Sequence, residues 1–165
     1  MNKKQCESIK TCADPLFVGI DPSINGTGII VLDKDANIVE QKLFSVKADT
    51  FEESLVKYED EISFIPNIMN LKGVCIEGPA YQSTGQVVLQ MGALHFLLRL
   101  FLFKKNINYK IIAPGTLKKF VTGTGVAKKE LMLLKTYKKW GAEFDNNNLC
   151  DAYGLARMAL EDFKE

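Results

Sequence analysis

The sequence predicts one α/β domain in which helices flank a mixed five-stranded sheet. Three apolar, β-prone segments come first, and helical and strand-like segments alternate after them, which is the order of a mixed sheet covered by helices. The length of 165 residues corresponds to one domain at about 150 residues per domain. A composition of 47% hydrophobic and 25% charged residues is typical of globular proteins and excludes a disordered or fibrous chain.

Five segments have the composition of strands, and turn residues separate the first three into an antiparallel meander. The fourth segment is nearly all apolar, as expected for a central strand that is buried on both faces. The predicted strands are 16–20, 28–33, 37–46, 71–77 and 109–113.

The helical segments follow the meander. The first of them carries six acids and one lysine, which is typical of a helix with a face exposed to solvent. The predicted helices are 49–61, 86–103, 114–121, 127–140 and 149–163. Residues 1–15 are polar and lack the apolar segment of a signal peptide. We therefore expect a tail at 1–15, with the disorder common at chain ends, ahead of a single domain at 16–165.

The helix predicted at 86–103 is apolar on nearly every side, and such a helix covers two surfaces. One surface is its own sheet. The second is expected to be the same helix of another copy in a homodimer, where Gly92 and Ala93 permit close approach. A helix enclosed within one domain is the alternative.

Cysteine usage and hydropathy predict a protein of a reducing, cytoplasmic compartment without a membrane partner. The four cysteines lack metal-finger spacing, and two lie in apolar segments, where a reduced cysteine behaves as a small hydrophobic residue. The apolar run 87–103 is interrupted by Gln90, His95 and Arg99, and it is shorter than the about 20 residues of a membrane span. His95, the single histidine, is expected to be a packed core or interface residue rather than a catalytic base.

The net charge of +1 conceals an uneven distribution of charge. Residues 1–103 carry 9 basic and 13 acidic side chains, or −4, and residues 104–165 carry 12 and 7, or +5. Ten lysines and one acid within 104–139 form a basic segment of the kind that binds a polyanion. Two lysine pairs flank the loop 122–126 and are expected to converge on one phosphate path, although solvated lysines are the alternative. These are Lys118, Lys119, Lys128 and Lys129.

Three carboxylates interrupt apolar segments at positions that a sheet would bring together. Asp21 ends the first strand, Glu77 ends the fourth, and Asp151 lies in the first turns of the last helix. Each alone is also typical of a turn, a strand end or a helix N-terminus. Three converging carboxylates repel one another unless divalent ions neutralise them, and oxygen-only ligation favours Mg²⁺ or Mn²⁺. Two ions about 3.5–4 Å apart stabilise the attacking and leaving oxygens of a phosphoryl displacement.

Several short motifs lie between residues 17 and 160, and the set of them, in this order, resembles that of the RuvC-type Holliday-junction resolvases. The element order is likewise that of ribonuclease H-like nucleases, and the compactness with an N-terminal extension resembles phage-encoded members. The motifs are Phe17-Val-Gly-Ile-Asp-Pro-Ser23, Gly26-Thr-Gly28, Val74-Cys-Ile-Glu-Gly-Pro79, Ala113-Pro-Gly-Thr-Leu-Lys-Lys119, Val121-Thr-Gly-Thr-Gly125 and Asp151-Ala-Tyr-Gly-Leu-Ala156.

The resemblance implies a homodimeric, Mg²⁺-dependent endonuclease that nicks opposed strands of a four-way DNA junction, with Mn²⁺ as a substitute and two ions per site. Asp21, Glu77 and Asp151 match metal-binding carboxylates of the family. Lys118 and Lys129 match basic residues near the scissile phosphate. Tyr81 matches an aromatic residue that wedges into the junction, and an ordinary loop aromatic is the alternative.

The fourth acid of the family would stand where this chain has Asn148. An amide ligates through its carbonyl oxygen but adds no negative charge, so weaker metal binding is expected. A natural variant, a compensating role for Asp145 and an engineered Asp→Asn change remain open. The alternative functions are a junction-binding protein with weakened catalysis and a ribonuclease H-fold nuclease for other branched DNA or RNA.

Overall fold

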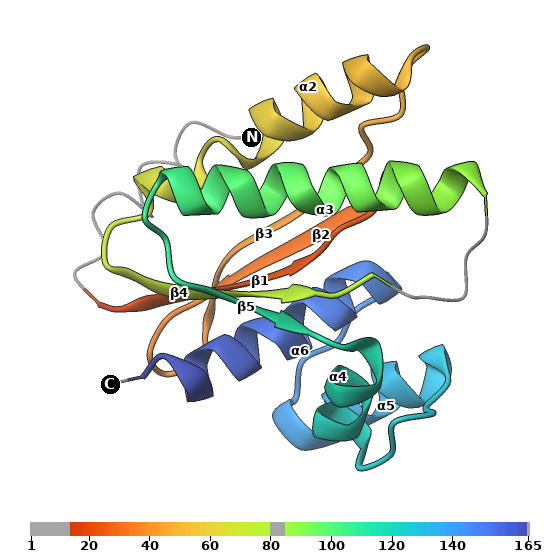
Figure 1. The fold of residues 1–165 in the computed structure, drawn as a ribbon. Helices are drawn as coiled ribbons and strands as arrows, with labels where there is room; N and C mark the ends of the chain where they lie inside the picture. Colours follow the sequence, from red (N-terminus) through yellow and green to blue (C-terminus); the bar gives the residue numbers. More distant parts are fainter. Residues whose placement is uncertain (1–13, 80–84, 165) are drawn as a thin grey trace.

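The computed structural model describes residues 14–79 and 85–164, which form a five-stranded sheet between two layers of helices (Figure 1). The strand order is β3-β2-β1-β4-β5. The pairs β3/β2 and β2/β1 are antiparallel, and the pairs β1/β4 and β4/β5 are parallel. The predicted mixed sheet is therefore confirmed. Its strands are β1 (Leu16–Asp21), β2 (Thr27–Leu32), β3 (Ile38–Phe44), β4 (Leu71–Glu77) and β5 (Tyr109–Ile112).

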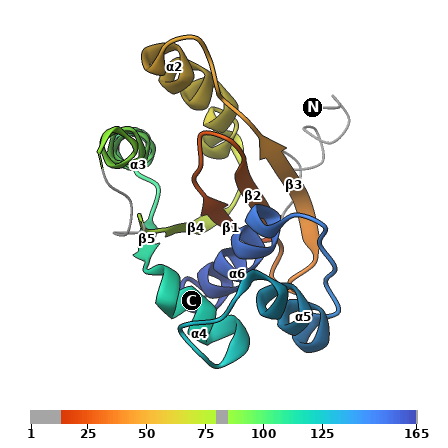
Figure 2. The same ribbon diagram turned by 90° about the vertical axis from the view of Figure 1, so that its right-hand side faces the viewer.

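The helices divide between the two faces of the sheet. Figure 2 shows α2 and α3 on one side and α6 on the other, with α4 and α5 outside α6. Both faces of the central strands are covered, so every residue of β1 and β2 is buried. The helical segments are α2 (Phe51–Ile62), the 3₁₀ turn η1 (Ile65–Asn67), α3 (Gln86–Lys104), α4 (Pro114–Thr122), α5 (Lys129–Trp140) and α6 (Asn147–Asp162).

Capping side chains explain why some helices begin away from the predicted residues. The helix predicted at 149–163 begins instead at Asn147, because the Asn146 side chain accepts hydrogen bonds from the backbone of Asn148 and Leu149. The helix predicted at 49–61 begins at Phe51, since Thr50 and Glu53 form a reciprocal capping box. Most of the expected tail at 1–15 lies outside the described residues.

Helix α3 packs on the sheet through one face only. Leu94, Leu98 and Leu102 are fully buried there. His95 is also buried, as expected, and burial lowers the pKa of its imidazole to about 4, which leaves it neutral near pH 7. Within the described part of the chain, α3 alone is long and apolar enough to cross a membrane, but that test considers only length and composition.

Helix α6 approaches β1 so closely that a side chain cannot fit between them. A Cβ atom at Gly19 would lie 2.0 Å from the carbonyl oxygen of Ala152 and 2.2 Å from the backbone nitrogen of Ala156. Gly28 of β2 faces the start of the same helix, where a Cβ atom would lie 2.3 Å from the Asn148 carbonyl oxygen. These glycines bring α6 down onto the sheet.

We predict that Gly19→Ala destabilises the protein by about 3 kcal/mol or more, because the added methyl group forces the α6 backbone away from β1. Urea unfolding followed by circular dichroism measures the change. Gly115→Ala is the matched control, since its Cβ atom would meet only the Gly125 carbonyl oxygen at an ordinary 3.7 Å. Equal stability of the two variants would contradict the role given to Gly19.

Candidate active site

The three predicted carboxylates come together at one end of the central strands. Asp21 is the last residue of β1 and Glu77 is the last residue of β4. These strands are parallel neighbours with Ile20 opposite Ile76, so the two acids leave the sheet side by side. Their carboxyl groups lie close enough for each to influence the pKa of the other. Asp151, in the second turn of α6, lies close enough for its charge to act on Asp21.

The environment of these acids opposes their ionisation. Asp21 is 8% exposed, and burial, followed by the negative charges of Glu77 and Asp151, holds its pKa well above the ordinary value. Burial and the Glu77 carboxylate raise the pKa of Asp151 to about 7. Burial also raises the pKa of Glu77. Asp151 therefore retains its proton in part of the molecules near pH 7, and a cation bound at the site would displace it.

Two of the predicted lysines supply part of the missing positive charge. The Lys118 ammonium on α4 acts on Glu77 and Asp151, where it opposes the rise in pKa. Lys129, the first residue of α5, acts in the same way on Asp21 and Asp151. The two helices thus bring one lysine each to the acids from opposite sides of the loop 123–128.

The other predicted lysines stand apart from the acids. Lys119 and Lys128 are exposed. Lys119 lines a separate hollow of about 400 Å³ with Lys135, Lys138 and Lys139. Of the four lysines that flank the loop, only Lys118 and Lys129 thus interact with the carboxylate cluster.

The donor set fits a hard divalent cation, although the side chains do not form a finished cage. Carboxylate oxygens are the ligands that Mg²⁺ and Mn²⁺ prefer, and a bound cation would offset the mutual repulsion of the three acids. Within residues 14–79 and 85–164, no three His, Cys, Asp or Glu side chains already stand in a metal-holding arrangement.

The Asn148 side chain binds the backbone of the turn that follows Asp21. Its amide nitrogen donates a hydrogen bond to the carbonyl oxygen of Gly26, in the turn between β1 and β2. This contact joins the start of α6 to the turn that follows Asp21. An aspartate has no hydrogen to donate at this position. Asp145 is exposed, and its charge is absent from those that shift the pKa values of the three acids.

Two tyrosines also bear on the site. Tyr81 lies outside the described residues, so its predicted contact with DNA stays a prediction. Tyr58 of α2 was not predicted from the sequence as a neighbour of the site; burial and, to a smaller degree, the charge of Asp21 raise the pKa of its hydroxyl. The apolar spacing of Tyr58 and Ile62 on an otherwise acidic helix was the available signal.

Comparison with known proteins identifies relatives over nearly the whole chain. The family model described as crossover junction endodeoxyribonuclease RuvC matches residues 17–158. The RuvC protein of Sulfurovum sp. is 26% identical over 153 residues, which cover 90% of this chain and 96% of the relative. The RuvC protein of Campylobacter hominis is 28% identical over 145 residues, or 85% of this chain and 92% of the relative.

Solved structures share the fold at low sequence identity. Thermus thermophilus RuvC in complex with a Holliday junction substrate has a TM-score of 0.76 at 17% identity, with 91% of this chain and 94% of that chain covered. The yeast mitochondrial Holliday junction resolvase Ydc2 has a TM-score of 0.64 at 11% identity, with coverage of 94% and 82%. The expected ribonuclease H-like fold is thereby confirmed.

We predict that the stability of the metal-free protein falls as the pH rises from about 4 to about 7. The pKa of Asp151 is raised from 3.8 to about 7 in the folded state, so between these values the folded protein binds more protons than the unfolded chain. Asp151→Asn should therefore gain on the order of 2 kcal/mol over wild type at pH 8 and little at pH 4.

Urea unfolding in EDTA at the two pH values checks this expectation. Glu161→Gln removes an exposed acid of the same helix and serves as the control. An unchanged pH slope in Asp151→Asn would show that this carboxylate titrates normally.

Proposed function

The chain belongs to the RuvC family of crossover junction endodeoxyribonucleases, and from this premise we propose that it resolves four-way DNA junctions at the Asp21–Glu77–Asp151 site. It is a nuclease that hydrolyses phosphodiester bonds, and nucleases of this family depend on divalent metal. The observation that carries the proposal is the convergence of three mutually repelling carboxylates, one buried and two half-buried, with Lys118 and Lys129. That arrangement suits a metal ion and a phosphate at the same place.

We assign the metal-binding role to Asp21, Glu77 and Asp151, with Mg²⁺ as the ion and two ions per site. When bound, such ions polarise the phosphoryl oxygens and lower the pKa of a bound water. The protein's own contribution is to hold three oxygen-donor side chains at the ends of two rigid strands and one helix. Binding of the ion would release the proton that Asp151 partly retains near neutral pH.

Lys118 and Lys129 are proposed to contact the scissile phosphate. In the free protein they offset part of the carboxylate repulsion, and with DNA bound they face the charge that develops on the phosphate. Lys119, Lys128 and Tyr81 are proposed as further DNA contacts. Asn148 is proposed as a positioning residue, since its hydrogen bond to Gly26 fixes the turn next to Asp21.

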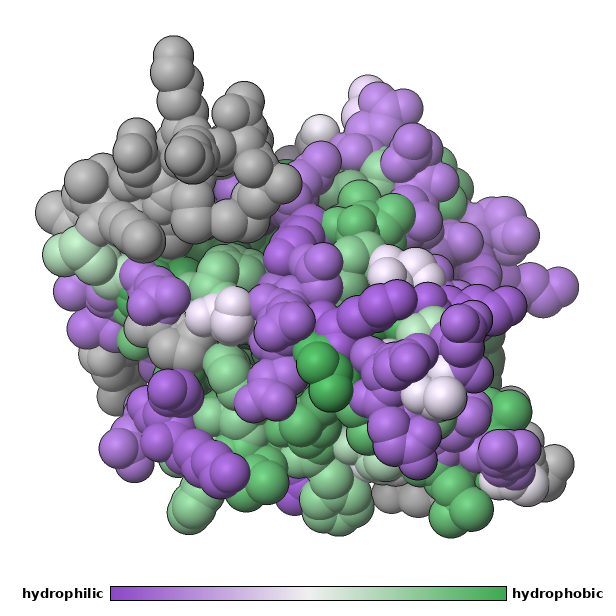
Figure 3. Space-filling model, turned by 90° about the horizontal axis from the view of Figure 1, so that it is seen from above, coloured by the Kyte–Doolittle hydropathy of each residue, from purple (hydrophilic) through white to green (hydrophobic). Residues whose placement is uncertain are grey.

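We propose that the protein is a homodimer through the outer face of α3. Large apolar residues are exposed along this helix at helical spacing, on the side opposite the buried face of α3. In the view from above, hydrophobic surface gathers along the lower edge of the molecule, where α3 lies (Figure 3). A two-fold copy would cover this stripe and supply the second site that two opposed nicks require. The stripe consists of Leu89, Phe96, Leu100 and Phe103.

The cysteines within residues 14–79 and 85–164 suit a reducing compartment. Cys75 and Cys150 are free and buried. Burial raises their pKa values to about 12 and about 11, which keeps both thiols protonated and unreactive. We propose a cytoplasmic location for these reasons.

We predict that wild-type protein with Mg²⁺ introduces paired nicks into a labelled four-way junction. Asp21→Asn, Glu77→Gln and Asp151→Asn should each lower the cleavage rate by about a thousandfold or more, because each removes a charged metal ligand. Junction affinity should persist, since the lysines remain.

Gel analysis of cleavage and gel-shift analysis of binding measure the two quantities separately, with Glu161→Gln as the control. Binding without cleavage by the wild type would indicate a junction-binding protein, and cleavage of duplexes or RNA–DNA hybrids at an equal rate would indicate a broader nuclease. Full activity in any of the three variants would remove that residue from the mechanism.

We predict that Phe96→Glu converts the dimer to a monomer, because it places a charge at the centre of the apolar stripe. Sedimentation at micromolar concentration should change from about twice 18.5 kDa to 18.5 kDa. Val56→Glu, at an exposed apolar position of α2, is the matched control and should leave the mass unchanged. A wild-type protein that sediments as a monomer would contradict the proposed dimer.

A further inference from the structure

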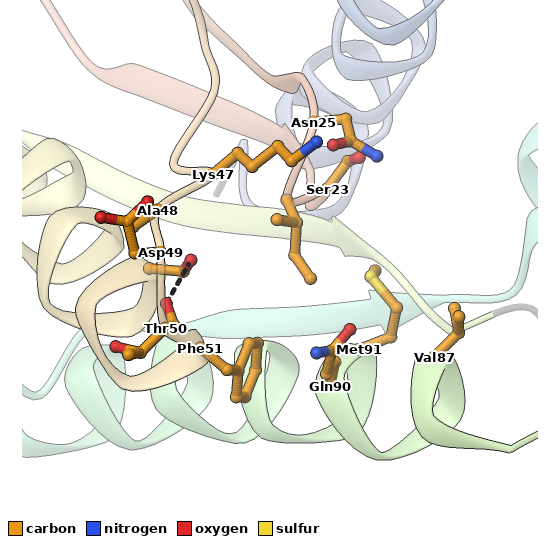
Figure 4. A pocket seen from close by; sticks show the side chains of 12 residues that line it. Ser23, Asn25, Lys47, Ala48, Asp49, Thr50, Phe51, Val87, Gln90 and Met91 are labelled. Atoms are coloured by element: carbon orange, nitrogen blue, oxygen red, sulfur yellow. Dashed lines mark hydrogen bonds between the residues drawn. The ribbon is translucent and has the colours of Figure 1, made fainter.

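A cavity of about 410 Å³ opens beyond the end of β1, and none of the three carboxylates of the site lines it. Its wall begins at Ser23, two residues after Asp21, and continues through the loop 47–50 to the first turns of α3. Figure 4 shows the Lys47 side chain extending toward Asn25 on one side, with Phe51 and Met91 on the other. The volume lies in the range of about 300–1,000 Å³ that small-ligand sites occupy. We call this cavity the turn pocket.

The chemistry of the turn pocket suits a flat, uncharged, polar ring. Phe51, Met91 and Ile24 give apolar surfaces, and Asn25 and Gln90 carry amides that both donate and accept hydrogen bonds. Neither amide side chain has a partner within residues 14–79 and 85–164. Lys47 and Asp49 contribute one charge of each sign, so the lining has no net charge. A nucleobase matches this combination of stacking surface and hydrogen-bonding edge.

The turn pocket lies next to the place where the cut DNA strand would bind in the proposed function. Hydrogen bonds between Ser23 and Thr27 close the turn that forms one wall, and the bond from Asn148 to Gly26 ties the same turn to α6. The wall is therefore fixed in place next to the metal-binding acids. On α3, Met91 shares the inward face with Leu94 and Leu98, opposite the stripe of Phe96 and Leu100. A second copy docked on that stripe would leave the pocket open.

We propose that the turn pocket receives one unstacked nucleobase of the strand that is cut, within one or two nucleotides of the scissile phosphate. The proposal rests on the proposed junction-resolving function and adds a place where the protein contacts a base rather than a phosphate. Phosphates would then be held by Lys118 and Lys129, and the base by Gln90, Asn25 and the apolar floor. Energy spent on unstacking the base is recovered by contacts in the pocket.

The experiment uses four-way junctions with the fluorescent base 2-aminopurine at each of the two nucleotides on either side of the cleaved phosphate. EDTA keeps the strand intact during binding. We expect fluorescence at one position to rise severalfold on binding to wild-type protein, because the base leaves the stack. Gln90→Leu removes the amide at nearly constant size, and Ala48→Trp fills the cavity. Both should abolish the rise while the junction stays bound.

A cleavage assay with an abasic site at the same nucleotide provides the second measurement. The abasic junction should be cut about tenfold more slowly by wild type, and the two variants should cut abasic and intact junctions at equal rates. Gln41→Leu makes the same chemical change on β3 and should behave as wild type. Circular dichroism checks that Ala48→Trp folds, and Gln90→Leu tests the pocket independently of that result.

The outcomes separate the two levels of the proposal. A fluorescence rise that survives both variants, or no rise at any position while wild type cuts the junction, overturns the nucleobase pocket alone. Wild type that neither cuts nor binds the junction overturns the proposed function, and the pocket proposal with it.

Discussion

The position of α6 against β1 is the constraint on which the rest of the site depends. Gly19 leaves no room for a side chain below Ala152 and Ala156, so the helix backbone lies on the strand itself. This contact fixes how far Asp151 stands from the end of β1, where Asp21 lies. Three acids on separate elements can share one ion only when those elements are held to within a fraction of an ångström. Backbone contact between the helix and the strand therefore sets the spacing of Asp151 from Asp21.

Charge balance is the second determinant of the site. Burial and mutual repulsion raise the pKa values of Asp21, Glu77 and Asp151, and Lys118 and Lys129 offset only part of this effect. Without a bound cation, the repulsion among these carboxylates therefore lowers the stability of the folded protein, and the packing of the core offsets this loss. Functional sites often carry such a cost, since groups arranged for a ligand are poorly arranged without one.

Much of the architecture could be predicted from local sequence. The nearly all-apolar segment 71–77 and the turn residues between the first strands were sufficient to predict the mixed sheet, and the acids at strand ends indicated the site. Helix starts were less predictable because they depend on caps such as Asn146, whose partners are backbone groups. The bond from Asn148 to Gly26 crosses 122 positions of sequence, so no local pattern contains it. The turn pocket likewise joins three separate segments.

The hydrogen bond from Asn148 to Gly26 requires a donor at position 148, and this excludes a carboxylate there. A side chain that donates to the Gly26 carbonyl cannot also present two anionic oxygens to a cation, and an aspartate would set its charge against the carbonyl dipole. Mechanical rigidity of the turn and electrostatic attraction for metal are therefore alternatives here rather than additive benefits. A substitution that introduces an acid at this position would require another donor to hold the Gly26 carbonyl.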